Sequence, residues 1–420
     1  MNLNPNNPDT KWIGEIPSDW SLEKVRYFFT ERSEKVDDTS YPPLSVSKGG
    51  VVDQIETVSK SDDNENRKMV LKDDFVINSR SDRKGSSGIS PRDGSVSLIN
   101  IVLEPKNINP QYAEYLFKSY YFKEEFFRNG KGIHFDLWST RYEMMKNILI
   151  PFPDLEEQKK IVHYLDEKIT PIDRMLELLK AKITSLHDLR DSIINKIFTK
   201  GIDLETEFKF SGDNWIGDIP SHWEVKKLKY LVLENQENLS KSTPSNLELD
   251  YIEISNINSI GQITKPTPYY FYDCPSRCRR ICRKGDVIIS TVRTYLKSIG
   301  LIKEERENLI CSTGFSVLTP REGYLSKYIF YMLRTNWFIS RIISKSEGVS
   351  YPSIKSHKLL NTKVVVTDVL EQQKIVDYLD KETSYIDELI IKEEKRLKLF
   401  KEYRQSLISE VVMGKKRVIG

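Results

Sequence analysis

The sequence predicts a two-domain repeat of mixed α and β structure, in which each of two globular bodies is followed by a long coiled-coil-like helix. A nine-residue marker, WIGEIPSDW at 12–20, returns as WIGDIPSHW at 215–223. A second block, EEQKKIVHYLDEKITPID at 156–173, returns without a gap as LEQQKIVDYLDKETSYID at 370–387. A chain of 420 residues is also too long for one ordinary core. The order of marker, body and helical block therefore occurs twice.

Composition excludes several classes of protein. Aromatic residues at 10% and hydrophobic residues at 39% suffice for cores, which argues against general disorder. No run of eighteen apolar residues occurs and the first residues lack a signal-peptide pattern, so we expect neither a membrane span nor secretion. Four cysteines suit a reducing cytoplasm, where we expect the protein to act. The net charge of +3 identifies no partner, so any basic surface must come from the distribution of charge.

Each helical block contains a heptad pattern. Apolar residues recur at alternating spacings of four and three, which is typical of a seam between paired helices. The predicted seam residues are Ile172, Leu176, Leu179, Ile183, Leu186 and Ile193 in the first block, and Ile386, Ile390, Leu397, Phe400, Leu407 and Val411 in the second. The interpretation that we favour is that one helix pairs with its own copy in the same chain.

The ends of the helices are predicted from capping residues. Thr170 and Ser384 hold equivalent positions, each with an Asp three residues later, which predicts an N-cap. Pro171 would then occupy the first helical position. Gly201 and Gly414 are the predicted stop signals.

Two arginines interrupt the predicted seam at matching places. Arg190 and Arg404 could extend their stems along an ordinary amphipathic helix and keep their charges in water. Alternatively, each could be a polar device that fixes the register of two paired helices. The sequence leaves both interpretations open.

Sequence motifs of catalysis were sought and not found. The chain has no GxxxxGK[ST] phosphate loop, no dinucleotide-binding glycine pattern and no Asn/Asp-Pro-Pro-aromatic tetrapeptide. Pro153-Asp154 followed by Glu157 to Lys159 faintly resembles a nuclease set, but both parts share one helix start and the second copy has Gln373 in place of the lysine. We therefore predict a chain without catalytic activity and without a cofactor of its own.

The four cysteines raise the question of a metal site. Cys274, Cys278 and Cys282 are spaced C-x3-C-x3-C, with Cys311 further on. Four thiolates could hold zinc, yet the usual arrangement is two separate pairs, and the first repeat has no counterpart. Reduced, partly buried thiols are the interpretation that we favour.

Polar loops follow a strand-like run in each body. The runs are DFVINSRSDRKGSSGIS at 74–90 and DVIISTVRTYLKSIGLI at 286–302, and residues 274–297 hold seven basic residues against one acid. Two further loops, KGIHFDLWSTR at 131–141 and KSEGVSYPSIK at 345–355, precede the helical blocks by similar distances. Such side chains grip phosphates, and arginine can also read guanine, although a solvated surface turn would look the same. The candidate nucleic-acid contacts are Arg80, Arg83, Lys84, Lys131, His134 and Arg141 in the first body, and Arg279, Arg280, Arg293, Tyr295, Lys297, Lys345, Ser350 and Tyr351 in the second.

The duplicated order of WIG-x-IP-x-x-W and a Glu-Gln-x-Lys-Ile-Val block resembles the specificity subunit of a type I restriction–modification system, over essentially the whole chain. The resemblance implies two α/β target-recognition domains separated by two long helices that pack antiparallel. On this basis we predict recognition domains at 1–153 and 201–367, and helical spacers at 154–200 and 368–420.

The resemblance also implies partners. Double-stranded DNA would be read in two unlike halves across a fixed gap. Two methyltransferase subunits would carry S-adenosylmethionine, and a restriction subunit would carry ATP-driven translocation and cleavage. The alternative is a structural adaptor whose paired helices are the active part and whose bodies bind protein. A self-sufficient modification enzyme would need a fused catalytic domain, which the sequence lacks.

Overall fold

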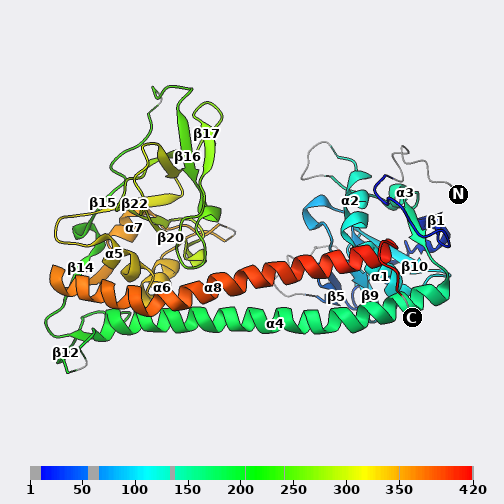
Figure 1. The fold of residues 1–420 in the computed structure, drawn as a ribbon, viewed down its shortest axis with the longest axis horizontal. Helices are drawn as coiled ribbons and strands as arrows, with labels where there is room; N and C mark the ends of the chain where they lie inside the picture. Colours follow the sequence, from blue (N-terminus) through cyan, green and yellow to red (C-terminus); the bar gives the residue numbers. More distant parts are fainter. Residues whose placement is uncertain are drawn as a thin grey trace. The chain divides into compact units, whose positions relative to one another are not determined.

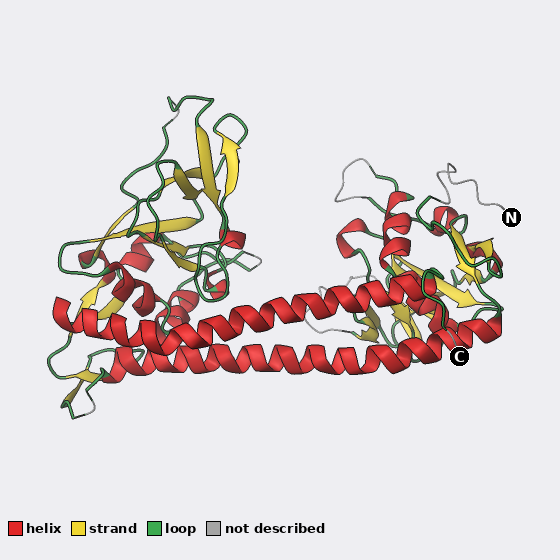
Figure 2. Ribbon diagram, in the orientation of Figure 1, coloured by secondary structure: helices red, strands yellow, loops and turns green. Residues whose placement is uncertain are grey.

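The computed structural model describes residues 11–54, 66–132, 138–203, 205–240, 242–349 and 351–418. The chain forms two compact units. Unit 1 comprises Met1–Lys180 and Lys395–Gly420, and unit 2 comprises Ala181–Glu394. Each unit contains one body and parts of both long helices. Figure 2 shows that each body contains both helices and strands.

The body of unit 1 is built on a four-stranded antiparallel sheet in the order β2-β10-β7-β8. The smaller sheets β3-β6-β9, β4-β5 and β1-β11 complete it. The strands are β1 (Ser21–Lys24), β2 (Phe29–Glu31), β3 (Lys35–Val36), β4 (Leu44–Ser47), β5 (Gly50–Asp53), β6 (Arg67–Val70), β7 (Phe75–Asn78), β8 (Ser87–Ile89), β9 (Gly94–Val96), β10 (Asn100–Pro105) and β11 (Leu149–Phe152). The short helices are α1 (Pro110–Lys118), α2 (Tyr120–Arg128) and α3 (Tyr142–Met145).

The body of unit 2 repeats this plan with the sheet β15-β22-β19-β20, and adds a second four-stranded sheet, β17-β16-β21-β18. Its strands are β12 (Phe208–Phe210), β13 (Asp218–Pro220), β14 (Glu224–Lys227), β15 (Val232–Glu234), β16 (Glu248–Ile252), β17 (Thr267–Tyr270), β18 (Cys278–Ile281), β19 (Val287–Ser290), β20 (Ile299–Leu301), β21 (Leu309–Ser312), β22 (Phe315–Pro320) and β23 (Lys363–Val366). The short helices are α5 (Ser326–Leu333), α6 (Asn336–Ser344) and α7 (Ser356–Leu360). Strands β14 and β23 pair as β1 and β11 do.

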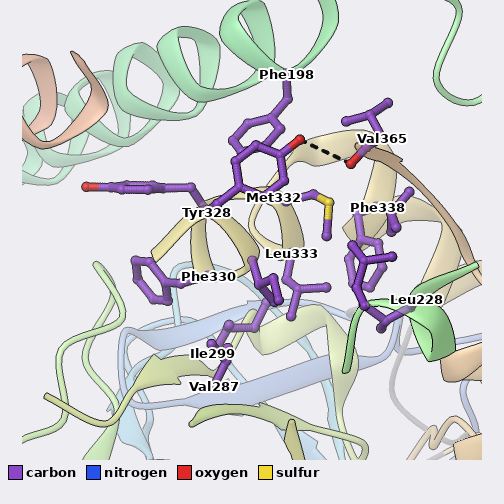
Figure 3. Close-up of a cluster of buried hydrophobic side chains, with 14 of the residues drawn as sticks. Phe198, Leu228, Val287, Ile299, Tyr328, Phe330, Met332, Leu333, Phe338 and Val365 are labelled. Atoms are coloured by element: carbon purple, nitrogen blue, oxygen red, sulfur yellow. Dashed lines mark hydrogen bonds between the residues drawn. The ribbon is translucent and has the colours of Figure 1, made fainter. Parts of the chain in front are cut away.

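The central strand of each main sheet is buried on both faces. In β19, Val287 and Ile289 pack into the cluster formed with α5 and α6, whereas Ile288 packs on the other face with Ile252 and Val317. Figure 3 shows Val287 beneath the helix side chains, with the Tyr328 hydroxyl donating to the Val365 carbonyl oxygen at 3.1 Å. Successive residues of a strand point to opposite faces, so an uninterrupted apolar run is stable only between two covering layers. The strand-like runs of the sequence are these sandwiched strands.

Two long helices run through the chain, α4 (Leu155–Lys200) and α8 (Val369–Val412), with 46 and 44 residues (Figure 1). The prediction that Thr170 and Ser384 cap them is wrong. Each helix begins about fifteen residues earlier, where Asp154 accepts a hydrogen bond from the Glu157 amide at 2.8 Å and Asp368 accepts one from the Glu371 amide at 2.9 Å.

Pro171 consequently lies inside α4 and not at its first position. A proline in a helix interior removes one backbone hydrogen bond and costs about 3 kcal/mol. The apolar face continues across it: Ile161, Leu165, Ile169 and Ile172 all belong to the core of unit 1. Burial of four large side chains outweighs the local cost, since each contributes roughly 1.5–3 kcal/mol.

The predicted seam residues are buried or half-buried in the structure. In unit 1, Ile172, Leu176, Leu407 and Val411 lie in the core, with Leu397 and Phe400 packed against it, and Leu179 is buried. In unit 2, Ile386 and Ile390 form a cluster with Ile260, against which Leu186 and Ile193 pack, while Ile183 is half-buried. Within each unit, therefore, one part of α4 packs against one part of α8.

The two seam arginines pair with aspartates of the opposite helix. In unit 2 the Arg190 Nε atom lies 2.5 Å from Asp387 Oδ1, and in unit 1 the Arg404 Nε atom lies 2.6 Å from Asp173 Oδ1. Asp173 and Asp387 are equivalent in the repeat, as are Arg190 and Arg404. The arginine of each helix thus pairs with the aspartate of the other helix. Both pairs can form only when the two helices run antiparallel. This reciprocity favours the role of these arginines in fixing the register.

The repeated marker packs on the end of a long helix. Gly201 and Gly414, both at φ +70°, follow the ends of α4 and α8. A Cβ atom at Gly414 would lie 2.3 Å from Pro17 Cδ and 3.1 Å from the Trp20 ring, so a larger residue would displace the marker. At Gly201 the nearest atom is Cγ of Pro220, the matching proline of the second marker, at 3.3 Å.

The repeated glutamine joins each body to its helix. Gln158 is fully buried; its Oε1 atom accepts from the Asn109 amide at 2.8 Å and its Nε2 atom donates to the Pro153 carbonyl oxygen at 2.9 Å. Gln372 likewise accepts from the Leu325 amide at 3.0 Å. These contacts explain why the glutamine occurs in both blocks.

Replacing Gln158 with leucine should therefore destabilise unit 1. The change keeps the side-chain volume but leaves the half-buried Asn109 amide and the buried Pro153 carbonyl without this partner, each costing about 1–3 kcal/mol. We expect the free energy of unfolding, measured by urea denaturation, to fall by about 2–4 kcal/mol. Glu157→Gln, one residue earlier and half-exposed, is the control and should change it by less than about 0.5 kcal/mol. Equal effects of the two substitutions would contradict the role of the buried amide.

Candidate nucleic-acid interface

The loop after β7 presents two exposed arginines. The Asn78 side chain ends the strand by accepting from the Arg80 amide at 3.0 Å, which turns the chain outward. Arg80 and Arg83 are exposed, and the one ion-pair partner of Arg83 among the described residues is its neighbour Asp82, at 3.6 Å. Lys84 differs: its Nζ atom lies 2.7 Å from Glu124 and 4.6 Å from the centre of the Phe127 ring. Lys84 therefore anchors the loop on α2, while the arginines remain available.

A single serine joins this loop to the second candidate loop of unit 1. Ser139 forms backbone bridges with both Arg80 and Lys131. The Lys131 amide donates to the Ser139 carbonyl oxygen at 3.0 Å, and the reverse hydrogen bond is 3.1 Å. Two loops that are about fifty residues apart in the sequence thus form one surface, with Arg80 and Lys131 both exposed on it.

The same arrangement, in which one serine bridges two loops through its backbone (a serine joint), occurs in unit 2. Ser353 forms backbone bridges with both Val292 and Glu347. Both hydrogen bonds between Ser353 and Glu347 are 2.9 Å. Ser139 and Ser353 are equivalent in the repeat, so the backbone arrangement is kept while the bridged side chains change completely.

An arginine stacks on a tyrosine beside the joint of unit 2. The Arg293 guanidinium lies 4.5 Å from the centre of the Tyr351 ring, and the Arg293 amide donates to the Pro352 carbonyl oxygen at 2.7 Å. Tyr351 is 64% exposed and Tyr295 is 51% exposed. Together they offer a flat, cationic and aromatic surface.

The backbone of this loop is strained. Arg293 and Lys297 both adopt the left-handed conformation at φ +52°, which costs about 1–3 kcal/mol per residue other than glycine. Lys297 is held there by an ion pair of 2.8 Å with Asp191 of α4. Since Lys297 is committed to the helix, its role is to support the loop that presents Arg293 and Tyr295.

Other predicted contacts lie away from the two joints or make contacts within the unit. Lys345 is half-buried with its Nζ atom 3.4 Å from Thr362 Oγ1, and burial lowers its pKa. Arg279 and Arg280 lie on β18, in the second sheet of unit 2, and burial lowers the pKa of Arg280. Arg141 is exposed at the start of α3. His134 and Ser350 lie outside the described residues.

Sequence reasoning missed the two serines that create the surface. Ser139 and Ser353 carry no charge and make their contacts through the backbone, so no motif pointed to them. Trp138 supports the joint of unit 1, since its Nε1 atom donates to the Phe127 carbonyl oxygen at 2.9 Å and its ring stacks on Phe127. The available signal was the repeat offset that Ser139 and Ser353 share with the helical blocks.

The cysteines are free thiols, with Cys278 and Cys311 on strands of the second sheet of unit 2 and Cys274 and Cys282 beside it. Cys278, Cys282 and Cys311 are buried and Cys274 is half-buried. Burial, with the neighbouring Cys274, raises the pKa of Cys278, so the thiol stays protonated at neutral pH. The described residues contain no group of three or more His, Cys, Asp or Glu side chains arranged to hold a metal ion. Reduced thiols stay our prediction for these four residues.

Comparison with known families accounts for both halves of the chain. The family model "Type I restriction modification DNA specificity domain" matches twice, at residues 20–186 and 220–399. The chain belongs to this specificity family. Each match contains one body with its loop joint and a large part of one long helix.

Two relatives of this specificity family extend over most of the chain. The MjaVIII specificity subunit of Methanocaldococcus jannaschii is 24% identical over 96% of this chain and 94% of its own length. The EcoR124I/EcoR124II specificity subunit of Escherichia coli is 27% identical over 67% of each chain. A chain from a solved structure titled as the basis of assembly and conformational transition of the type I R-M system is similar in fold, with a TM-score of 0.55 and 18% identity over 96% of this chain and all of that one.

Within the described ranges, no helix combines the length and the apolar character that a membrane span requires.

Proposed function

We propose that this chain is the DNA-recognition subunit of a type I restriction–modification complex, and that each unit reads one half of a bipartite, asymmetric target. One observation carries the proposal. The serine joint holds the same backbone geometry in both units, but it presents Arg80 and Lys131 in unit 1 where it presents Val292 and Glu347 in unit 2. A constant frame with changed side chains is what reading two different sequences requires, because base edges are distinguished by side-chain donors, acceptors and apolar groups.

In this proposal the chain recognises the DNA sequence, and its partner subunits catalyse methylation and cleavage. The absence of nucleotide, S-adenosylmethionine and nuclease motifs supports a non-catalytic role. In this proposal S-adenosylmethionine is bound by the methyltransferase subunits and ATP by the restriction subunit, and the complex acts in the cytoplasm.

The long helices set the gap between the half-sites and dock the methyltransferase subunits. Support comes from apolar side chains that point away from the seam at equivalent positions of the repeat. Leu155 and Val369 are 46% and 45% exposed, and Leu189 and Tyr403 are 51% and 55% exposed. A docking surface that occurs twice suits two copies of one partner.

Binding to duplex DNA tests the proposal. The affinity of the purified chain should fall steeply with salt, because contacts with phosphates release counterions. The adaptor alternative predicts no such binding.

Arg83→Ala and Arg293→Ala should each weaken binding of the chain to duplex DNA. A base contact would cost about 1–3 kcal/mol and relax one target position, whereas a phosphate contact would weaken all sequences alike and lower the salt slope.

Lys84→Ala is the matched control for Arg83→Ala, since Lys84 is already paired with Glu124. We expect a smaller loss of affinity from this change. If the chain binds duplex DNA with no salt dependence, or does not bind it at all, the proposal is wrong.

A further inference from the structure

Two exposed tyrosines occupy the same position in the two units. Each closes a single 3-10 turn, Val25–Tyr27 in unit 1 and Leu228–Tyr230 in unit 2. Tyr27 is 58% exposed and Tyr230 is 57% exposed. The two residues are separated by the same 203 positions as the two markers, so they belong to the constant frame of the repeat.

Each tyrosine has a cation over its ring. The Arg26 guanidinium lies 5.4 Å from the centre of the Tyr27 ring, and Lys229 Nζ lies 5.2 Å from the centre of the Tyr230 ring. At an exposed site such pairing contributes about 0.5–1 kcal/mol. The turn therefore presents an exposed aromatic side chain beside a positive charge in both units.

A second cation borders each turn. The Lys106 amide donates to the Phe28 carbonyl oxygen at 2.7 Å, directly after the first turn. Arg321 makes the equivalent contact in unit 2, with its amide donating to the Leu231 carbonyl oxygen at 2.8 Å. Over the described ranges, no ion pair engages Arg26, Lys106, Lys229 or Arg321. Their charges are free to meet a partner.

Strand register places these turns away from the serine joints. In unit 1, Phe29 pairs with Pro105 at one end of β10, whereas Asn78, from which the candidate loop departs, pairs with Asn100 at the other end. In unit 2, Val232 pairs with Pro320 at one end of β22, and Ser290 pairs with Phe315 at the other. In both units the tyrosine turn thus lies at the opposite end of the main sheet from the candidate DNA surface.

The two surfaces also differ in what the repeat preserves. At the serine joints the side chains change between the units, as unlike half-sites require. At the tyrosine turns the kinds of side chain are the same in both units. Each unit has the tyrosine, a basic residue directly before it, and a second basic residue whose amide binds the carbonyl oxygen just after the turn. A surface that is constant in both units fits a partner that is the same at both places.

We propose that the tyrosine turn of each unit is a second docking contact for a methyltransferase subunit, besides the exposed positions of the long helices, and that it meets an acidic surface of that subunit. This inference rests on the proposed function. The tyrosine ring would enter a shallow apolar pocket of the partner, and the two cations would meet carboxylates. Tyrosine and arginine are the side chains that most often dominate the energy of such interfaces.

The experiment uses the full chain and the methyltransferase subunit of the same system. Arg26→Glu with Tyr27→Ala removes the surface of unit 1, and Lys229→Glu with Tyr230→Ala removes that of unit 2. Each double variant should keep the thermal midpoint and the DNA affinity of the parent chain. Native mass spectrometry should show one bound methyltransferase in place of two, and the combined variant should bind methyltransferase at least tenfold more weakly. Tyr272→Ala, at a site that is 70% exposed, is the control and should bind two.

Each other outcome overturns the inference. Two methyltransferases at parental affinity on the combined variant would show that the turns do not contribute to docking. Loss of DNA affinity by the isolated chain, with methyltransferase binding intact, would assign the turns to phosphates. A parent chain that binds no methyltransferase would refute the partner in the proposed function itself, and the inference with it.

Discussion

Replacing Asp387 with alanine should lower the free energy of unfolding of unit 2 by about 3–5 kcal/mol, whereas the equivalent Asp173→Ala should lower that of unit 1 by no more than about 1 kcal/mol. The two ion pairs are equivalent in the repeat but differ in burial. The side chains of Arg190 and Asp387 are 2% and 19% exposed, and those of Arg404 and Asp173 are 35% and 46% exposed.

The expected losses of stability differ because water can solvate an arginine that has lost its aspartate only where the arginine is exposed. Without Asp387, the Arg190 guanidinium keeps a contact of 3.4 Å with the Ile260 carbonyl oxygen, and among the described residues its Nη1 atom has no partner even in the parent chain. An uncompensated charge in the interior is strongly destabilising. Arg404, in contrast, keeps access to solvent when Asp173 is removed.

Urea denaturation followed by amide hydrogen exchange separates the two units. The control is the double substitution Arg190→Met with Asp387→Leu, which removes both charges and should recover most of the loss, since apolar replacement of a buried pair is often neutral. Salt should weaken the Asp173 pair and leave the Asp387 pair nearly unchanged. Equal losses in the two single variants, or no recovery in the double variant, would contradict this account.

The fold was largely predictable from the repeat and from the heptad spacing. Ile172, Leu176 and Ile390 could be placed at the seam because helical periodicity depends only on the sequence and on the geometry of the helix. The start of α4 could not be placed, since Thr170-Pro171 satisfies the local capping rule as well as Asp154 does. Only the continuity of the core across Pro171, which is a tertiary property, decides between them.

The candidate site was less predictable than the fold. Basic loops can be recognised by composition, but composition does not show which charges are already paired, and Lys297 is committed to Asp191. Arg279 and Arg280 are next to each other in a basic run, yet their strand belongs to the second sheet. The serine joints depend on backbone bridges between segments that are distant in the sequence, and such bridges leave no compositional trace.

Exchanging residues 21–153 for the equivalent body of a relative should change one half of the DNA target and leave the other half and the gap in place. The exchange removes both joined loops of unit 1 together with β1 and β11, which pair with each other, so no strand pair is cut. The retained helix still offers Gln158 and Asp166, which bind the Asn109 amide and the Tyr115 hydroxyl in the parent body.

The target is measured by sequencing the methylated bases of a host that carries the chain with its methyltransferase. The original target should lose modification, because specific sites exceed non-specific DNA in affinity by about 10³-fold or more. A control exchange of residues 224–367 should change the opposite half, and carrying out both should change both halves while the gap persists. The gap should resist each exchange because it depends on the reciprocal Arg190–Asp387 and Arg404–Asp173 pairs, which lie outside both exchanged segments. In the second exchange the residue at position 260 should be kept, since the Ile260 carbonyl oxygen accepts a hydrogen bond from Arg190. A first exchange that altered both halves together, or neither, would show that the two bodies do not read DNA independently.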